Sequence, residues 1–388
     1  MIARRATALL AATALIGLVA PSSLAAWAAS PADFTLEPGP VSSVASVSPD
    51  VYYDTTNATY YLFTTGFTIG VYSSPDGTSW TAVPGAVSPT GPVADPSVIA
   101  MPDGTYRMYY AYRSGTTQPC SGKQLRYATS PDLIRWTAQP DVLLGDLGCG
   151  VPNVVRAGAG DYRLYYVRGG DGVEHGTYLA TSTDGLSWTP QSGIRTPPDM
   201  VDPSVVQLSD ASWLMLTADF PSGKSSGPFY QKLYAATSRD GLTWDFGSTT
   251  PIYTAPARQG AFDPDAVVLP DGSIRVWWAQ GTSAETAVVA AGTVVESDVS
   301  ILIVGSRTTI GGKPGILITG TTSGLADGTT LIPSYHFPGQ TTYLQGSARP
   351  VITDGTFTWQ RKTGKKFYAR VATADGLKSN TVSIQAPD

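Results

Sequence analysis

The stretch Ser74-Pro75-Asp76-Gly77-Thr78-Ser79-Trp80 (SPDGTSW) decides the fold because the chain repeats its pattern. Three more copies of Ser-x-Asp-x-x-x-Trp follow: SPDLIRW at 130–136, STDGLSW at 182–188 and SRDGLTW at 238–244. Successive copies begin 52–56 residues apart. A period of this length is typical of propellers and solenoids. The repeat therefore indicates a chain built from similar successive units.

Two further elements recur in step with this motif. Upstream of it lies an aromatic run that alternates large apolar and polar residues, as a half-buried strand does. The five runs are TYYLFTT at 59–65, TYRMYYAYR at 105–113, DYRLYYVRG at 161–169, SWLMLTADF at 212–220 and SIRVWWAQG at 273–281. Before each lies an x-Pro-x element that opens an apolar run: SPDVYY at 48–53, DPSVIA at 95–100, VPNVVR at 151–156, DPSVVQ at 202–207 and DPDAVV at 263–268.

Together these elements describe a four-stranded antiparallel unit, with Pro-Asp-Gly turns at 102–104 and 270–272 as hairpin signals. Five units predict an all-β fold, a five-bladed β-propeller over residues 34–297. The fifth unit lacks the Ser-x-Asp-x-x-x-Trp motif, as terminal repeats often depart from consensus.

We interpret the motif as part of the frame rather than as a ring of binding sites. Its Ser and Asp side chains are suited to bond local backbone N–H groups, and its Gly allows a positive φ. The Trp is expected to pack between neighbouring blades, where it adds apolar area to a fold with little core per blade.

The character of the chain changes near residue 298: the blade repeat stops and short strand-like runs separated by Gly, Pro and Asp-Gly follow. We predict a small immunoglobulin-like β-sandwich over 298–388. This part resembles C-terminal modules of secreted actinobacterial proteins, which generally tether or space. Trp359 and Tyr368 are expected in its core, with a sugar-stacking platform as the less favoured interpretation.

Charge is divided unevenly between these parts. Residues 305–388 hold nine basic and four acidic residues, a net charge of +5, so the remainder carries −10. An acidic body argues against nucleic acid as a partner, because Lys and Arg supply affinity for phosphate backbones. The basic module leaves contact with an anionic cell wall open, although solvated surface charge is the commoner explanation.

The first residues read as a secretory signal peptide, which we place at 1–28. Arg4 and Arg5 form a basic region, 6–20 is an apolar run and Ala26-Trp27-Ala28 supplies a cleavage site. The apolar run is shorter than a membrane span requires. We therefore expect an extracellular, monomeric protein without a membrane span.

The two cysteines, Cys120 and Cys149, predict one disulfide in an exported protein. The propeller topology tests this pairing. Cys120 lies in the loop between the second and third strands of the second blade, and Cys149 lies just before the first strand of the third. Both positions fall on the same face.

That face also receives the start of every innermost strand, so acids gather at the mouth of the central channel. Asp95, Asp202 and Asp263 directly precede a proline, and Asp50 and Asp265 directly follow one. In a regular strand, the residue after the proline points the same way as the one before it. The loops of this face add Arg113, Arg168, Glu174 and His175. Such a funnel suits a neutral polyhydroxylated ligand.

The Asp-Pro-Ser openings, the run MPDGTYRMYY and turns such as ATSPDLIRW resemble the five-bladed glycoside hydrolases of families 43, 32, 62 and 68. The resemblance covers about residues 45–295. It implies cleavage of a glycosidic bond, on an arabinan-, xylan- or fructan-like glycan, by carboxylates at three strand openings. In family 43 these are an Asp base, an Asp that orients it and a Glu acid.

The match to this pattern is incomplete. Ser48 stands where the first blade should carry Asp, Val151 occupies the third opening, and no opening carries Glu. The three Asp-Pro openings fall in blades two, four and five, which is the expected arrangement rotated by one blade. On this hypothesis Asp95 is the base or nucleophile, Asp202 its orienting partner and Asp263 the acid, with Glu174 as the alternative acid. Asp50, Arg113, Arg168, Glu174 and Asp265 are the predicted substrate contacts.

Other interpretations compete with this one. An Asp repeated at equivalent openings serves equally well to cap backbone N–H groups, which would leave a secreted glycan-binding propeller without catalysis. A sialidase is less favoured, because its Asp-containing turn is one residue longer and it needs an arginine cluster. We expect no cofactor and no metal site in the protein; a calcium ion in the channel stays open.

Overall fold

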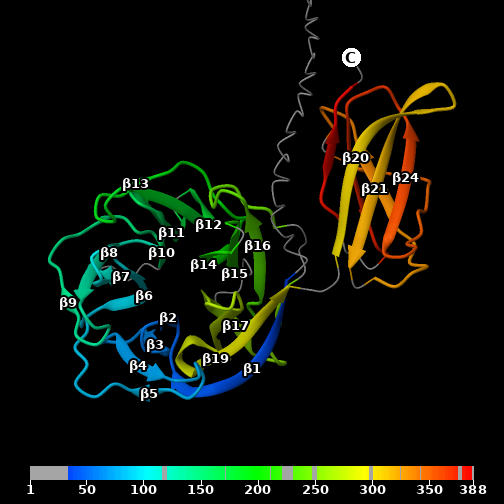
Figure 1. The fold of residues 1–388 in the computed structure, drawn as a ribbon. Helices are drawn as coiled ribbons and strands as arrows, with labels where there is room; N and C mark the ends of the chain where they lie inside the picture. The colour runs from blue at the N-terminus through cyan, green and yellow to red at the C-terminus, as the bar shows by residue number, and fades with distance from the viewer. Residues whose placement is uncertain are drawn as a thin grey trace, which may run out of the picture.

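The computed structural model describes residues 34–115, 120–170, 172–209, 211–220, 230–246, 251–296, 300–323, 325–340, 342–374 and 378–386. The expected signal peptide lies outside them. In this part of the chain the strands assemble into seven antiparallel sheets. Five sheets follow one another around a central axis, as Figure 1 shows.

The first three sheets each consist of four strands that pair in chain order. They are β2 (Asp50–Asp54), β3 (Thr59–Thr64), β4 (Gly70–Ser74) and β5 (Thr81–Ala82); β6 (Val93–Ala100), β7 (Tyr106–Arg113), β8 (Lys123–Ser130) and β9 (Thr137–Ala138); and β10 (Gly150–Gly158), β11 (Asp161–Gly170), β12 (Val173–Ser182) and β13 (Thr189–Pro190). Each outermost strand has two residues and continues from a Ser-x-Asp-x-x-x-Trp turn. The predicted order of strands is confirmed here.

The fourth and fifth sheets depart from the predicted unit. The fourth has three strands in the described residues, β14 (Met200–Gln207), β15 (Trp213–Asp219) and β16 (Leu233–Ser238). The fifth joins β17 (Gly260–Val268), β18 (Ile274–Gly281) and β19 (Val288–Glu296) to β1 (Phe34–Ala45). A short 3-10 helix, η2 (Ala284–Thr286), connects β18 to β19. The fifth unit is thus completed by the N-terminal strand rather than by a motif of its own.

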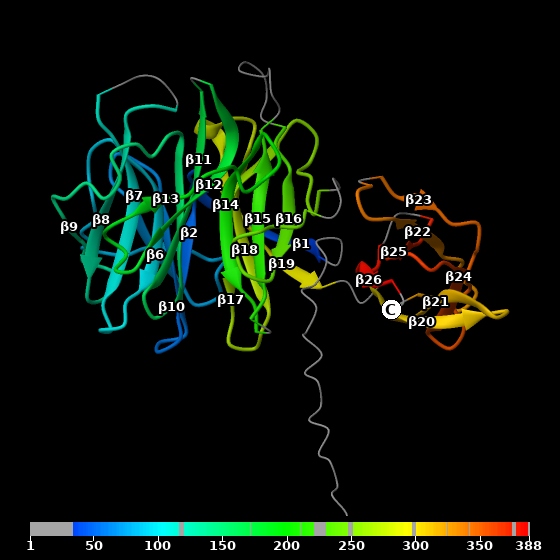
Figure 2. The same cartoon turned by 90° about the horizontal axis from the view of Figure 1, so that it is seen from above.

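The innermost strands β2, β6, β10, β14 and β17 contact one another in this order, and β17 contacts β2 again. Separate hydrophobic clusters fill the spaces between neighbouring sheets. In Figure 2 these strands stand side by side around the axis. Because β1 pairs with β19 from Phe34–Glu296 to Ala45–Val288, the first and last strands of the ring are hydrogen-bonded to each other.

The tryptophans of the repeat pack between sheets as predicted. Trp136 contacts Phe63 of the preceding sheet with ring centroids 5.6 Å apart, and Trp188 contacts Tyr109 at 5.9 Å. In the turn at Ser182, the hydroxyl of Ser182 accepts the Gly185 N–H, and Asp184 accepts the N–H groups of Leu186 and Ser187. The motif is therefore part of the frame.

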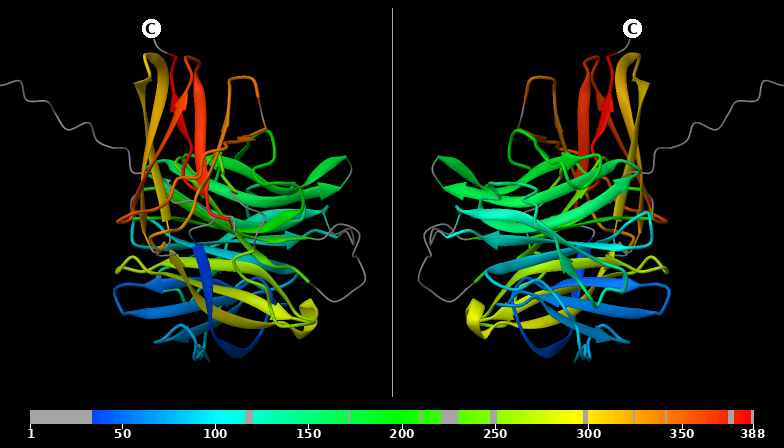
Figure 3. Two further views of the ribbon diagram at one scale, coloured as in Figure 1. Left: turned by 90° about the vertical axis from the view of Figure 1, so that its right-hand side faces the viewer. Right: turned by 90° about the vertical axis from the view of Figure 1, so that its left-hand side faces the viewer.

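The two remaining sheets come from the C-terminal part. One has the order β20 (Ser300–Ile310), β21 (Lys313–Ser323), β24 (Thr356–Lys362); the other has β23 (Leu344–Gln345), β22 (Ile332–His336), β25 (Phe367–Ala372), β26 (Val382–Ile384). They share a core that includes Ile318, Trp359 and Phe367. They stand beside the ring in Figures 1 and 2 and partly overlap it in the side views of Figure 3. Trp359 is buried as predicted. Tyr368 is not, because it lies on an outer face and stacks on His336.

The described residues contain no helix that is both long and apolar enough to cross a membrane.

Candidate active site at the ring axis

Every x-Pro opening adopts the same unusual backbone. Ser48, Asp95, Val151, Asp202 and Asp263 all have φ between +48° and +56°. A residue before proline normally favours extended backbone, and a positive φ is strained for any residue other than glycine. In β6, β10, β14 and β17 the ladder shifts register across this residue. The regular alternation expected from sequence is therefore broken by a bulge, which re-aims a side chain.

The five openings meet at the axis. A cavity of about 30 Å³ is lined by all five prolines, Pro49, Pro96, Pro152, Pro203 and Pro264. Ser48, Asp95, Val151 and Asp263 line it from one side, and Asp50, Asn153 and Asp265 also contribute. A space of this size holds one or two water molecules. Residues from five strands far apart in the sequence thus share one small polar volume.

Ser48 joins two of the candidate acids. Its hydroxyl oxygen lies 2.8 Å from Asp95 Oδ1 and 3.0 Å from Asp263 Oδ2, and its backbone N–H donates to Asp263 Oδ2 at 2.9 Å. A hydroxyl has one hydrogen to donate, so the second contact is satisfied only when a carboxyl donates its proton to the Ser48 oxygen. The position that lacks the expected Asp therefore bridges its two neighbours.

Asp202 completes the group from the fourth sheet. Its Oδ2 accepts the Asp263 N–H at 3.4 Å and an amide N–H of Gln231 at 3.3 Å. Burial raises the pKa of Asp202, and the charges of Asp263 and Asp95 raise it further. The charges of both other acids therefore act on the pKa of Asp202, and the charge of Asp263 has the larger effect.

The same physics applies to Asp263. Burial, followed by the charge of Asp95, raises the pKa of Asp263 to about 6, although the hydroxyl and N–H of Ser48 oppose the shift. Crowded carboxyls in a site of low polarity cannot all ionise together at neutral pH. Proton donor and proton acceptor can therefore coexist in this group near pH 6.

Asp95 differs from the other two because it faces a cation. Lys123 Nζ lies 3.7 Å from Asp95 Oδ2, and both side chains are largely buried. The same ammonium donates to the carbonyl of Cys149, and the Val151 N–H donates to Asp95 Oδ2 at 3.1 Å. A side chain at Gly150 would meet both: its Cβ would lie 2.8 Å from Lys123 Nζ and 2.9 Å from Asp95 Oδ2.

Nothing in the sequence selects Lys123, because a single lysine at the start of a strand carries no functional signal.

Asp50 and Asp265 lie one layer deeper than the sequence suggested. Asp50 accepts the Val98 N–H at 3.1 Å, and Asp265 accepts the Val51 N–H at 2.7 Å. The equivalent residues Ser97, Asn153 and Ser204 accept N–H groups of Val154, Val205 and Ala266 in the same way. Each sheet is thus tied to the next by one bond, in a closed ring of five bonds that we call the amide ring.

Burial raises the pKa values of both acids in the amide ring. The pKa of Asp265 rises to about 7. Burial also raises the pKa of Asp50, and the charge of Asp265 adds to that rise. These two carboxyls hold sheets together, and their place below the openings separates them from Asp95, Asp202 and Asp263.

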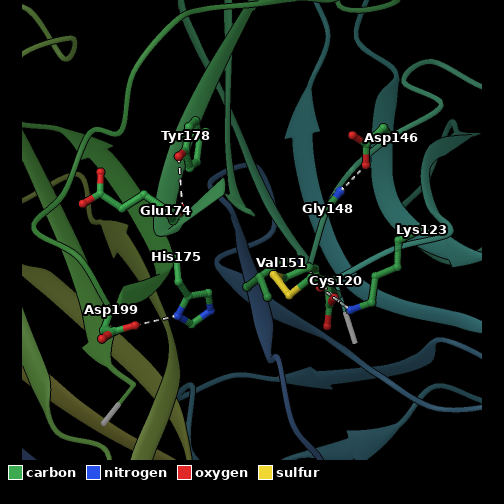
Figure 4. The surroundings of a disulfide bond; sticks show 11 residues. Cys120, Lys123, Asp146, Gly148, Val151, Glu174, His175, Tyr178 and Asp199 are labelled. Carbon is green, nitrogen blue, oxygen red and sulfur yellow. Dashed lines mark hydrogen bonds and ion pairs between the residues drawn. A yellow bond between two sulfur atoms is a disulfide. The ribbon is translucent and has the colours of Figure 1, made fainter. Parts of the chain in front are cut away.

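Four loop residues were expected near the mouth: Arg113, Arg168, Glu174 and His175. Figure 4 shows two of them, Glu174 and His175, in the surroundings of the disulfide. Arg168 pairs with Asp146 at 3.1 Å, and His175 Nδ1 lies 2.9 Å from Asp199 Oδ1. Arg113 and Glu174 are exposed, and Figure 4 shows the Glu174 carboxylate pointing away from Lys123 and the disulfide. None of the contacts described for these four residues reaches the carboxyls of the axis.

Cys120 and Cys149 form the predicted disulfide, which links residues 29 apart. His175 lies close to the two sulfur atoms. A metal site with these three ligands is excluded while the disulfide is intact, because zinc and similar ions bind the thiolate form. The bond fixes the segment that carries the Cys149 carbonyl and the Val151 N–H, both of which contact the Asp95–Lys123 pair.

Comparison with protein families and curated proteins gives only short sequence matches. No protein-family model matches the chain. An uncharacterised protein of Mycobacterium tuberculosis, Rv1502, is 33% identical over 114 residues, which span 27% of this chain and 37% of that protein. The chain thus spans little more than a third of the length of its curated relatives, and a second M. tuberculosis protein, MT1551, matches to the same extent.

Solved structures match over a larger part of the chain. A thermostable family-43 glycoside hydrolase covers 71% of this chain and 94% of its own, with 16% identity and a TM-score of 0.52. The α-L-arabinanase of Cellvibrio cellulosa covers 70% and 95%, with 15% identity and a TM-score of 0.51. An exo-β-1,3-galactanase of Phanerochaete chrysosporium covers 89% and 98%, with 11% identity and a TM-score of 0.50. The structural neighbours of this all-β chain are family-43 propeller enzymes.

Proposed function

We propose that the protein is a secreted glycoside hydrolase whose ring is a five-bladed β-propeller over 34–297, and that it acts on a plant or cell-wall glycan of the arabinan, xylan or galactan kind. The proposal rests on one observation: Asp95, Asp202 and Asp263 lie together in one buried cluster of hydrogen-bonded polar groups. The structural neighbours support it with enzymes whose names include an arabinanase and a galactanase.

The three carboxyls receive distinct roles. Asp95, held by Lys123 and two N–H or O–H donors, is the base or nucleophile. Asp263, with a pKa of about 6, is the acid that protonates the leaving oxygen. Asp202 sits against Asp263, whose charge raises the pKa of Asp202, while a side-chain hydrogen bond with Asp202 lowers the pKa of Asp263. We therefore assign Asp202 to tuning the acid rather than to orienting Asp95.

The parts outside the ring complete the proposal. Residues 1–28 direct export, residues 298–388 form an immunoglobulin-like module that spaces or tethers the enzyme, and the protein acts as a monomer outside the cell. The basic residues of the module provide its contact with anionic wall polymers.

A second function is favoured by one observation. Asp95, Asp202 and Asp263 each accept a main-chain N–H from the following opening or its neighbour. This is what caps in a glycan-binding propeller without catalysis would do.

One experiment separates the two functions. Wild type and the Asp95→Asn and Asp202→Asn variants are incubated with arabinan, xylan and galactan, and reducing ends and binding heats are measured in parallel. An enzyme releases sugars as wild type, and the variants lose hydrolysis by at least about 100-fold but keep binding. Binding without release by wild type on any polymer identifies the binding propeller instead.

A further inference from the structure

The far end of the ring holds a second and larger cavity. It has a volume of about 450 Å³, within the range of small-molecule sites. Its walls come from the innermost strands beyond the amide ring, and all of its lining residues belong to β2, β6, β10, β14, β15 and β17. The amide ring separates it from the group of Asp95 and Asp263, so it is a different site.

One layer of the cavity wall is largely apolar. Counting four residues on from each opening gives one layer of five side chains, and all of them line the cavity: Tyr52, Ile99, Val155, Val206 and Val267. Regular alternation resumes below the bulge, so these side chains point to the axis. An apolar body of about 10–15 heavy atoms fits between them.

The floor of the cavity is acidic. Asp50 and Asp265 line it from the amide ring, and each accepts a backbone N–H of the next sheet through one oxygen. The other oxygen of Asp265 accepts the Ser204 hydroxyl at 3.3 Å. Burial raises the pKa of Asp50, and the charge of Asp265 raises it further. Within the described residues neither forms an ion pair with Lys, Arg or His. Two buried acids without a cation leave a place that a positive charge would stabilise.

We propose that this cavity binds a small amphiphilic cation, an ammonium group on an apolar body, with the ammonium between Asp50 and Asp265 and the body against the five apolar side chains. The mixed lining distinguishes this ligand from the neutral glycan of the mouth. Arg156 and Gln207 lie at the exposed rim, where solvent screens their charge and polarity.

The test uses the full chain and two probes of equal shape, 2-phenylethylammonium and neutral 2-phenylethanol, titrated by calorimetry at pH 8. We expect the ammonium to bind at least about tenfold more tightly than the alcohol, since one ion pair in a partly buried site is worth that much. Equal affinity for both probes, or no binding of either, overturns the proposal.

Two variants localise the binding. Asp265→Asn keeps an acceptor for the Val51 N–H but removes a charge, and we expect it to weaken the ammonium about tenfold without changing the alcohol. Val206→Trp fills the cavity and should abolish binding of both probes. Unchanged ammonium affinity in either folded variant contradicts the assignment. If one variant does not fold, the other still decides.

Proton linkage gives an independent readout. The ionisable side chains that line the cavity are Asp50, Tyr52, Tyr53, Arg156 and Asp265, with Asp95 and Asp263 on the other side of the amide ring. Because burial raises the pKa of Asp265 to about 7, this floor acid is partly protonated near neutral pH. The ammonium should therefore bind more tightly at pH 8 than at pH 5 and release a proton. Asp95→Asn is the matched control: it should leave these titrations unchanged, whether or not the protein hydrolyses glycans.

Discussion

Two sets of repeated aspartates lie at different distances from the axis of the ring. Asp76, Asp132, Asp184 and Asp240 stand in the outer turns, whereas Asp50, Asp95, Asp202, Asp263 and Asp265 stand at the axis. Both sets accept main-chain N–H groups. Yet hydrogen bonds lower the pKa of Asp184 in its turn, and burial raises the pKa of Asp265 at the axis.

The difference between the two pKa shifts comes from hydration of the carboxylates. An exposed carboxylate keeps its hydration and gains from each N–H donor, so its charged form is favoured. At the axis, the loss of hydration and the proximity of other acids outweigh the same donors. The outer set is uniform and structural, whereas the axial set varies from sheet to sheet. Irregularity within a repeat therefore marks the place where chemistry is to be sought.

The largest expected effect separates the proposed base from the proposed acid. Asp95→Asn should lower kcat/KM by about 10²–10⁴-fold on any glycoside, because water is no longer activated. Asp263→Asn should cost as much on a polysaccharide but far less on an aryl glycoside, whose phenolate leaves without a proton. Steady-state kinetics on both substrates measures this.

The pH profile checks the same assignment. The activity of wild type should fall as pH rises above about 6, where Asp263 loses its proton, and Asp263→Asn should lack this limb on the aryl substrate. An equal loss in both variants on both substrates would show that neither carboxyl has a separate role.

The next largest expected effect is on stability and concerns a tryptophan that packs between two sheets. Trp136 is 3% exposed, contacts Phe63 and donates its indole N–H to Leu133 O at 3.0 Å. Trp136→Ala should lower the free energy of unfolding by about 3–5 kcal/mol, measured by urea denaturation. Trp80 occupies the same motif position but is only half-buried, so Trp80→Ala should cost clearly less. Equal losses would mean that motif position, rather than burial, sets the contribution.

The repeated strands and turns of the ring could be predicted from the sequence because their motifs recur along the chain. The turns, the aromatic second strands and the disulfide follow from local patterns, and the structure bears them out. The pairing of Phe34–Ala45 with β19 was not predictable, since its partner lies some 250 residues away in a segment with no motif. Ring closure is a long-range contact that no local pattern encodes.

The candidate site was only partly predictable for a related reason. The Asp-Pro openings pointed to the axis, but the positive φ of Ser48 and Val151 and the resulting bulges run against the usual preference before proline. The contacts of Ser48 with two acids, and of Lys123 with Asp95, depend on distances between different sheets. Spacing along the chain does not report these distances.

The axial aspartates should also control how stability depends on pH. Because the pKa of Asp265 is raised to about 7 in the folded state, its protonated form stabilises the fold below about pH 4, and this contribution is lost as pH rises through 7. Asp265→Asn keeps the acceptor for Val51 N–H without the charge. We expect the variant to be more stable than wild type at pH 8, on the order of 1–4 kcal/mol, and to differ less at pH 5. A variant less stable at both pH values would show that the charged form is the stabilising one.

The smallest expected effect has the opposite pH dependence. Asp184 accepts the N–H groups of Leu186 and Ser187, both at 2.7 Å, and its pKa is lowered in the fold. Asp184→Ala should therefore cost about 1 kcal/mol at pH 7. The cost should begin to shrink as pH falls below about 4, where the unfolded chain takes up the proton, and should vanish only below the lowered pKa of the folded state. Urea denaturation at pH 7 and pH 3 measures how far the cost has fallen. Asp240→Ala, in the equivalent turn, is the matched control, and the two losses should add because the turns belong to different sheets. A cost for Asp184→Ala that grows on acidification would mean that burial, not hydration, governs the outer set as well.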